Sequence, residues 1–166
     1  MRIFIVTLFS LFLLSGCGYK PSSYYAKKVL LDSVGTKVIV SLQNPQNTVI
    51  IRDAIDEAVI MRFRTNLVSY DKATTKLKIE LLNYTLSHQQ YDKNGYVTLE
   101  RALVTLRVTR LTNNEKKVYK ASGIHDFSIE ANAAITDTIR FNAIREGASK
   151  AIDGFLAQVS AEGTYK

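Results

Sequence analysis

The chain has 166 residues, a formal net charge of +7 and a single cysteine. This length suits one ordinary domain with one hydrophobic core, and a lone cysteine excludes an intramolecular disulfide. The excess of positive charge predicts anionic partners, although no concentrated basic run selects among them.

The first residues are typical of a secretory signal and are set apart from the domain. Arg2 supplies a positive charge, the stretch from Ile3 to Leu14 is almost entirely apolar, and small residues precede Cys17. The apolar stretch is shorter than the roughly 20 residues that a membrane-crossing helix needs. We therefore expect residues 1–16 to be a cleaved signal peptide.

The sequence Leu14-Ser15-Gly16-Cys17 resembles the lipobox of bacterial lipoproteins, in which the cysteine is acylated and becomes the mature N-terminus. Attachment by more than one acyl chain is lasting, whereas a single chain anchors only marginally. Gly18 stands where an inner-membrane retention signal would have Asp. The resemblance implies lipid on Cys17 and a place at the outer membrane of a Gram-negative cell, on the periplasmic side. This location argues against a nucleic-acid partner.

The mature chain begins with a stretch that lacks sustained periodicity. We interpret residues 17–35 as the lipidated N-terminus and a tether, with an ordinary extended lead-in strand as an equal alternative. The folded domain is expected over residues 36–163. It opens with a strand that contains Val38, Val40 and Leu42, followed by an amphipathic helix over residues 48–66.

Three strands joined by short turns are predicted next. The apolar residues of the first, which ends near Tyr91, change parity after Leu81, and this predicts a bulge. Asn94-Gly95 predicts a tight hairpin turn because both residue types tolerate a positive φ. The core side of the return strand is expected to carry Ala102, Val104, Leu106 and Val108.

A second turn at Asn113-Asn114 leads into the last strand, over residues 118–129, in which Gly123 marks a possible bend. Thr136 or Asp137 is expected to cap a final helix, and Gly163 to stop it. Gly147 and Gly154 fall inside this helix, where each costs about 1 kcal/mol relative to alanine. Either close packing on the sheet or simple tolerance explains them.

The order strand-helix-strand-strand-strand-helix predicts an α+β fold. Each helix has one apolar face, so the economical arrangement is a two-layer α/β sandwich with a mixed four-stranded sheet and both helices on one face.

No constellation of residues that could carry enzyme chemistry occurs in the sequence. His88 and His125 lack a His, Cys or clustered carboxylate at metal-ligand spacing, and neither a phosphate-binding glycine loop nor a nucleophile elbow occurs. Asp53, Asp56 and Glu57 suit solvated ion pairs on a helix better than an acid–base pair. We expect no enzyme, no metal and no cofactor, and the roles of the two histidines stay open.

The hairpin tip is the candidate ligand site. Tyr91, Lys93 and Tyr96 surround Asn94-Gly95, and a rigid tip can present the lysine cation to a phosphate or a sugar. The alternative is an ordinary solubilising loop. A wider basic surface along the hairpin is predicted from Arg101, Arg107, Arg110, Lys117 and Lys120. Protection of a sheet edge by charge explains several of these residues equally well.

The lipobox, the start Cys17-Gly18-Tyr19-Lys20-Pro21 and the hairpin Lys93-Asn94-Gly95 resemble the LptE family of lipopolysaccharide-assembly lipoproteins, over nearly the whole mature chain. The resemblance implies an outer-membrane lipoprotein that plugs the β-barrel LptD, aids assembly of that barrel and binds lipopolysaccharide during its insertion into the outer leaflet. It implies a lipopolysaccharide contact for Lys93. The family's second basic contact has no counterpart here, because residues 131–135 contain no cation. The alternative is a structural or secretion-accessory lipoprotein that binds only proteins.

Overall fold

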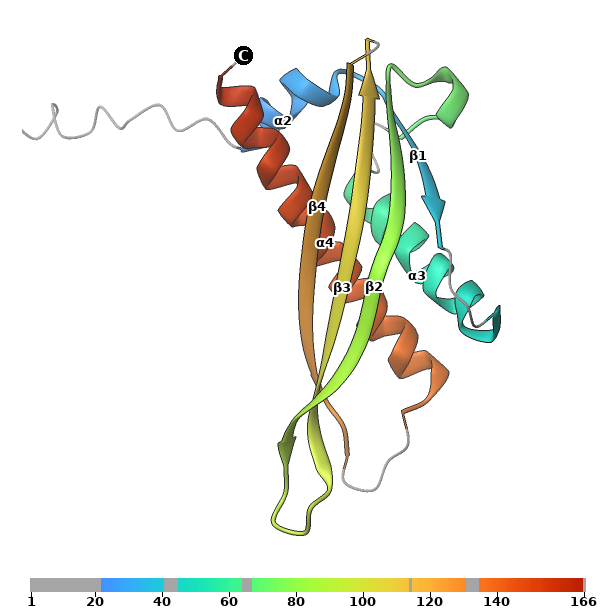
Figure 1. Cartoon of the computed structure of the whole chain (residues 1–166), viewed down its shortest axis with the longest axis vertical. Coiled ribbons are helices and arrows are strands. Elements are labelled where there is room, and N and C mark those ends of the chain that lie inside the picture. The colour runs from blue at the N-terminus through green and yellow to red at the C-terminus, as the bar shows by residue number, and fades with distance from the viewer. Residues whose placement is uncertain (1–21, 41–44, 64–66, 114, 131–134, 166) are drawn as a thin grey trace, which may run out of the picture.

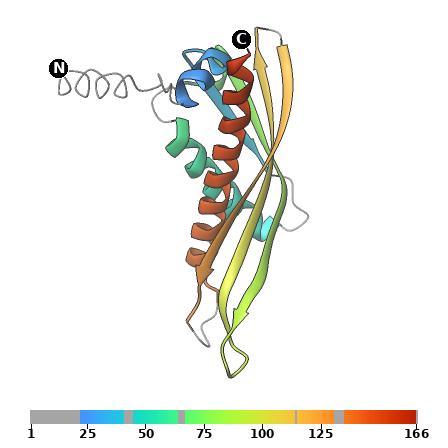
Figure 2. The same cartoon turned by 90° about the vertical axis from the view of Figure 1, so that its left-hand side faces the viewer.

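The computed structural model describes residues 22–40, 45–63, 67–113, 115–130 and 135–165. Its elements, in chain order, are α2 (Ser22–Leu30), β1 (Val34–Ile39), α3 (Pro45–Phe63), the 3-10 helix η1 (Tyr70–Lys72), β2 (Thr75–Tyr91), β3 (Val97–Thr112), β4 (Glu115–Ser128) and α4 (Asp137–Thr164). The strands form one sheet in the order β1-β2-β3-β4, with β1 parallel to β2 and the other pairs antiparallel. Helices cover one face of this sheet and leave the other face open (Figures 1 and 2). The predicted α+β sandwich with a mixed four-stranded sheet is confirmed, and the described residues form three α-helices in place of two.

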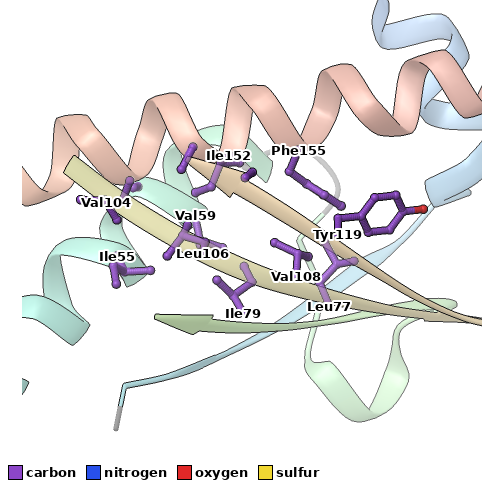
Figure 3. Packing of buried hydrophobic residues seen from close by; sticks show 14 of the residues in the cluster. Ile55, Val59, Leu77, Ile79, Val104, Leu106, Val108, Tyr119, Ile152 and Phe155 are labelled. Atoms are coloured by element: carbon purple, nitrogen blue, oxygen red, sulfur yellow. The ribbon is translucent and has the colours of Figure 1, made fainter. Parts of the chain in front are cut away.

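The hydrophobic core lies between the sheet and the helices. Ile55 and Val59 of α3, together with Ile152 and Phe155 of α4, face the apolar side chains of the strands (Figure 3). The strand residues in this cluster include Leu77, Ile79, Val104, Leu106, Val108 and Tyr119. Because full burial of an aliphatic or aromatic side chain contributes roughly 1.5–3 kcal/mol, these residues hold the two layers together. The predicted core side of the return strand is confirmed.

Helix α2 occupies most of the stretch interpreted as a tether. Ala26, Val29 and Leu30 are buried, and α2 lies against the C-terminal part of α4 (Figure 1). A Cβ at Gly163 would come within 2.2 Å of the Tyr25 carbonyl oxygen. The tether interpretation is therefore wrong from Ser22 onward, and Gly163 serves close helix packing while α4 continues to Thr164.

Two boundaries also differ from prediction. β1 begins at Val34, which is buried, and ends at Ile39, so it lies earlier than expected. Leu42 and residues 17–21 lie outside the described residues. α3 ends at Phe63 and begins at Pro45, a residue that helices accept in their first turn because its missing N–H would be unpaired there.

Glycines allow α4 to approach the sheet closely. β4 stays in regular register with β3 through the pair Val104 and Gly123, so β4 has no bulge at this glycine. A Cβ at Gly123 would lie 2.0 Å from the Gly147 carbonyl oxygen, and one at Gly147 would lie 2.8 Å from a Val104 methyl. Close packing thus explains Gly147. A Cβ at Gly154 would lie 3.8 Å from Ala121 Cβ, which is an ordinary contact distance. Packing does not require a glycine at this position, so Gly154 is simply tolerated.

Several local predictions are confirmed. The register of β2 shifts between Leu81 and Asn83, which is the expected bulge. Thr136 caps α4, since its hydroxyl accepts a hydrogen bond from the Ile139 N–H at 3.3 Å. The second turn contains Asn113 at a φ of +49°, and Asn114 lies outside the described residues.

Candidate functional site

The β2–β3 hairpin projects beyond the rest of the sheet. β1 pairs only with the first part of β2, from Thr75 to Glu80, whereas β2 and β3 stay paired out to Tyr91 and Val97. The hairpin tip therefore lies at the far end of the long axis from α2 (Figures 1 and 2). A ligand or partner can reach this tip without displacing the core.

The backbone of the tip is held by Asp92. Its N–H donates to the Tyr96 carbonyl at 2.8 Å, and its own carbonyl accepts from the Gly95 N–H at 3.1 Å. One carboxylate oxygen of Asp92 accepts from the N–H groups of Asn94 and Tyr96, both at 2.8 Å. Gly95 has a φ of +85° and Asn94 does not share this conformation. The turn is therefore the three-residue kind that ends on a left-handed glycine, rather than one with two left-handed residues.

The predicted side chains gather at the tip as expected, but without an aromatic clamp. Lys93 and Asn94 are exposed, as are Tyr91 and Tyr96. Among the described residues, the cation–ring contacts lie elsewhere, and Tyr91 instead meets the ring of His88 edge-on at 6.0 Å between centroids. Lys93 is thus exposed on a loop whose backbone is held by hydrogen bonds.

A buried carboxylate marks the stem of the hairpin. The Glu100 side chain is 1% exposed and contacts His88 Nδ1 across the strands. Its second oxygen has no hydrogen-bond partner in the described structure, nor does the Tyr84 hydroxyl nearby on the same face. Burial chiefly, and the charge of Glu100 in smaller part, raise the pKa of Tyr84 to about 12, against the lowering effect of Arg140. The His88–Glu100 pair fixes the strands where the register of β2 shifts between His88 and Tyr91.

His125 packs against a neighbouring aromatic ring. Its ring stacks nearly parallel on Phe127, with centroids 6.1 Å apart. Burial and the charge of Lys150 lower the pKa of His125, so the neutral ring is favoured. Within the described ranges, no group of three or more His, Cys, Asp or Glu residues is arranged to hold a metal.

The predicted basic surface is divided between the two faces of the sheet. Arg110 is 1% exposed on the helix side, so its assignment to the outer surface is wrong. The alternation that directs Val108 inward also directs Arg110 inward. Lys117, its register partner on β4, points to the same side.

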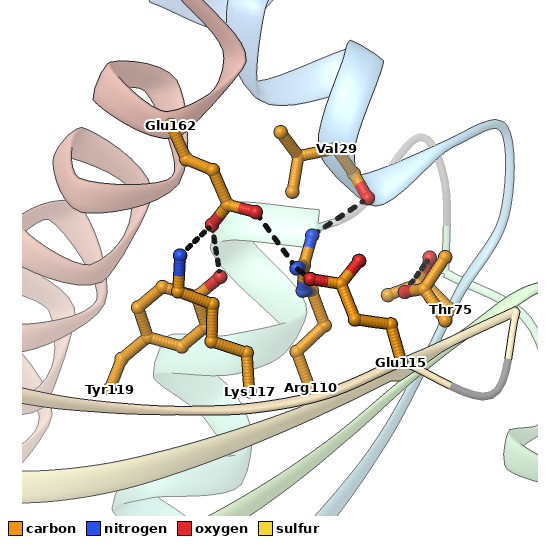
Figure 4. A network of polar contacts seen from close by, with 8 residues as sticks. Val29, Thr75, Arg110, Glu115, Lys117, Tyr119 and Glu162 are labelled. Atoms are coloured by element: carbon orange, nitrogen blue, oxygen red, sulfur yellow. Dashed lines mark hydrogen bonds and ion pairs between the residues drawn. The ribbon is translucent and has the colours of Figure 1, made fainter. Parts of the chain in front are cut away.

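Arg110 is the centre of a polar network that joins four elements (Figure 4). Its guanidinium lies 3.0 Å from a Glu162 oxygen on α4 and 3.4 Å from Glu115 on β4, and it donates to the Val29 carbonyl of α2 at 3.3 Å. The other Glu162 oxygen accepts from the Tyr119 hydroxyl at 2.6 Å and from Lys117 at 2.9 Å. This network therefore ties α2 and α4 to the sheet.

The network sets the ionisation of Glu162. Partial burial raises its pKa, but the hydrogen bonds from Tyr119 and Lys117 and the charge of Arg110 outweigh this effect and lower the pKa to about 2. Burial and the hydrogen bond to Glu162 raise the pKa of Tyr119. Glu162 is therefore an anion, and Tyr119 a donor, throughout the neutral range.

This shift predicts a specific loss of stability in acid. The pKa of Glu162 is lower in the folded chain than its ordinary 4.5, so its ionisation stabilises the fold fully above pH 4.5 and progressively less as the pH falls towards 2. We expect the difference in unfolding free energy between the native chain and Glu162→Gln to be constant from pH 7 to 5 and to shrink below. Urea unfolding at each pH measures it. A difference that does not change with pH would contradict this account.

The remaining predicted cations lie on the open face of the sheet. Arg101 forms a two-pronged ion pair with Asp126, at 2.7 and 2.8 Å. Arg107 lies 3.9 Å from Glu80 and is in register with Lys120. Four further lysines lie on this face but were not among the predicted cations. Each alternates along its strand with residues of the core, and this alternation places it on the open face. They are Lys37, Lys76, Lys78 and Lys116.

The predicted acylation site, Cys17, lies outside the described residues. No helix within them has the combination of length and apolar character that crossing a membrane requires.

No protein-family model and no curated protein matches the chain. Solved structures of similar architecture include a presumed lipoprotein from Caulobacter crescentus CB15, at 8% identity and a TM-score of 0.48, covering 88% of this chain and 100% of that one. Rare lipoprotein B from Shewanella oneidensis covers 79% and 91%, at 12% identity and a TM-score of 0.40. A minor lipoprotein from Acinetobacter baumannii covers 80% and 94%, at 10% identity and a TM-score of 0.43. Likenesses this distant assign the chain neither a family nor a function.

Proposed function

We propose that this chain is an outer-membrane lipoprotein, acylated on Cys17, that partners an LptD-like β-barrel and binds lipopolysaccharide through the tip of its β2–β3 hairpin. It binds and does not catalyse. The observation that carries the proposal is the projecting hairpin, whose hydrogen-bonded loop presents the exposed Lys93 at the end of the molecule. The resemblance of the sequence to the LptE family supports the choice of ligand and partner.

The chemistry of the tip suits a phosphorylated glycolipid. The Lys93 ammonium is a compact charge that can donate to phosphate oxygens, and the exposed rings of Tyr91 and Tyr96 offer apolar faces to a sugar. One Asp92 oxygen already accepts two backbone hydrogen bonds, so that carboxylate serves the loop.

The middle of the open face of the sheet, around Thr105 and Ser122, suits the polar interior of a barrel. Ser122 is exposed there, and its hydroxyl is hydrogen-bonded to that of the buried Thr105 at 2.9 Å. Because α2, α3 and α4 all lie on the other side of the sheet (Figure 2), a surrounding wall can approach this face directly.

Lys93→Glu tests the ligand. We expect lipopolysaccharide binding by the purified mature chain to weaken about tenfold, because a charge-assisted hydrogen bond is lost and a repulsive charge replaces it. Lys150→Glu, an equal change of charge on the exposed side of α4, is the control and should leave binding unchanged. Equal binding by both variants would exclude the tip as the site.

Co-purification from outer-membrane extracts tests the partner. An LptD-like β-barrel is expected to remain with the chain after mild detergent extraction. If such a barrel co-purifies but the native chain binds no lipopolysaccharide, the protein is an accessory lipoprotein with protein partners only.

A further inference from the structure

Charge is distributed unevenly along the long axis of the domain. Lysines dominate the end that contains α2, η1 and the turn between β3 and β4. We call this surface the basic end and define it by Lys28, Lys72, Lys76, Lys78, Lys116 and Lys120. Nearby carboxylates are fewer, namely Asp32, Asp71, Glu80, Glu115 and the partly buried Glu162. Around the hairpin stem and the start of α4, by contrast, Asp92, Asp126, Glu130 and Asp137 offset the few cations.

The described chain begins at the basic end. Ser22 is the first residue of α2, and α2 lies at the opposite end of the molecule from the hairpin tip (Figures 1 and 2). Ser22 follows Cys17 so closely in the sequence that the connecting backbone can span at most about 18 Å. A lipid on Cys17 therefore keeps the basic end, and not the hairpin tip, next to the membrane.

Exposed apolar and aromatic side chains lie among these lysines. Leu111 is 42% exposed and Val118 54% exposed on the open face, and Tyr165 is 92% exposed at the end of α4. The Lys28 ammonium lies 5.7 Å from the ring of Tyr24. Mixed lysine, tyrosine and aliphatic surfaces suit the headgroup region, where charge stays in water and apolar groups reach inward.

We propose that the basic end lies on the anionic phospholipid headgroups of the membrane that holds the acyl chains of Cys17. Each lysine close to such a surface strengthens association by about fivefold, so several of them orient a tethered domain. The long axis then stands away from the membrane, with the Lys93 tip directed away from these headgroups. This inference rests on the acylation of the proposed function but requires neither lipopolysaccharide nor a barrel.

Lysine footprinting on the acylated chain tests the orientation. The chain is reconstituted into vesicles of phosphatidylcholine alone or with phosphatidylglycerol, treated with a membrane-impermeant amine reagent and analysed by mass spectrometry. We expect Lys72, Lys116 and Lys120 to react about fivefold more slowly on the anionic vesicles, with Lys93 and Lys150 as internal controls that do not change. Added salt should restore the reaction.

The outcomes decide the inference in either direction. Protection of the basic end that depends on anionic lipid and is lost in salt supports it. Equal reaction rates on both kinds of vesicle, or protection of Lys93 instead, would overturn it. Protection that arises only when a barrel protein is added would also overturn it, and would assign the surface to a protein.

A charge-reversal pair supplies a second test that does not depend on the anchor. The mature chain with Cys17→Ser keeps every described element, and its sedimentation with phosphatidylglycerol vesicles reports the basic end alone. Adding Lys116→Glu and Lys120→Glu is expected to weaken association at least about thirtyfold, whereas adding Lys150→Glu should change it little. Circular dichroism confirms that each variant is folded. Comparable association by all variants would refute the proposed surface, whatever the result with lipopolysaccharide.

Discussion

Gly123→Ala is expected to destabilise the domain by about 3 kcal/mol. The new Cβ would lie 2.0 Å from the Gly147 carbonyl oxygen and 2.4 Å from the Ala151 nitrogen. Both are backbone atoms of α4, so no side-chain rotation relieves the clash and the helix must move away from β4. That movement loosens the packing of Ile152 and Phe155 in the core. Equilibrium unfolding in urea measures the loss.

Gly154→Ala is the matched control for this substitution. The same change on α4 would place a Cβ 3.8 Å from Ala121 Cβ, which is ordinary contact. We expect it to be neutral or to stabilise the domain by up to about 1 kcal/mol, because alanine favours a helix more than glycine does. Similar unfolding midpoints for Gly123→Ala and the native chain would mean that α4 does not approach β4 this closely.

Glu162→Ala is expected to cost about 3 kcal/mol, since it leaves the buried charge of Arg110 without its nearest partner. Glu115 remains at 3.4 Å but is half exposed, and it compensates only in part. The Tyr119 hydroxyl also loses its acceptor. A drop in the unfolding free energy in urea, with the slope unchanged, would identify a loss of native stability.

A surface pair provides the comparison for Glu162→Ala. Glu57 lies 3.2 Å from Arg145, and its side chain is 43% exposed. Glu57→Ala is therefore expected to cost at most about 1 kcal/mol, as exposed ion pairs do. If the two alanine variants lost the same stability, the Arg110 network would be no more important than a surface contact.

Much of the sheet could be predicted from the sequence because its signals are local. The alternation through Val104 to Val108, the parity change after Leu81 and the glycine at position 95 each specify backbone geometry within a few residues. The fold class follows from the order of these elements. Thr136, too, marks the start of α4 by itself.

Helix α2 could not be predicted in the same way. Ala26, Val29 and Leu30 do have helical spacing, but a helix of 9 residues is too short to be stable alone. Its stability comes from docking against α4, and the glycine that permits this contact lies at position 163. No local pattern reports a contact over that separation.

The candidate site likewise has parts set by local sequence signals and parts set by contacts between distant residues. The tip residues around Lys93 are neighbours in the sequence, so a hairpin prediction brings them together. The inward position of Arg110 follows from the alternation of β3 only if that alternation is extended to a charged residue. Its burial depends on Glu162, which lies far away in the sequence. Likewise, the basic end combines α2 and η1 with two strands, β2 and β4, and becomes visible only in the assembled structure.

The docking of α2 on the end of α4 has a consequence for the order of biosynthesis. The chain is made from its N-terminus, so α2 is complete long before Gly163 and Glu162 exist. Its apolar face must remain without its native partner until the C-terminal part of α4 has been made, a period in which exposed hydrophobic surface favours aggregation. The domain can therefore close only once α4 is complete, and a chain cut before Glu162 would have no place for α2.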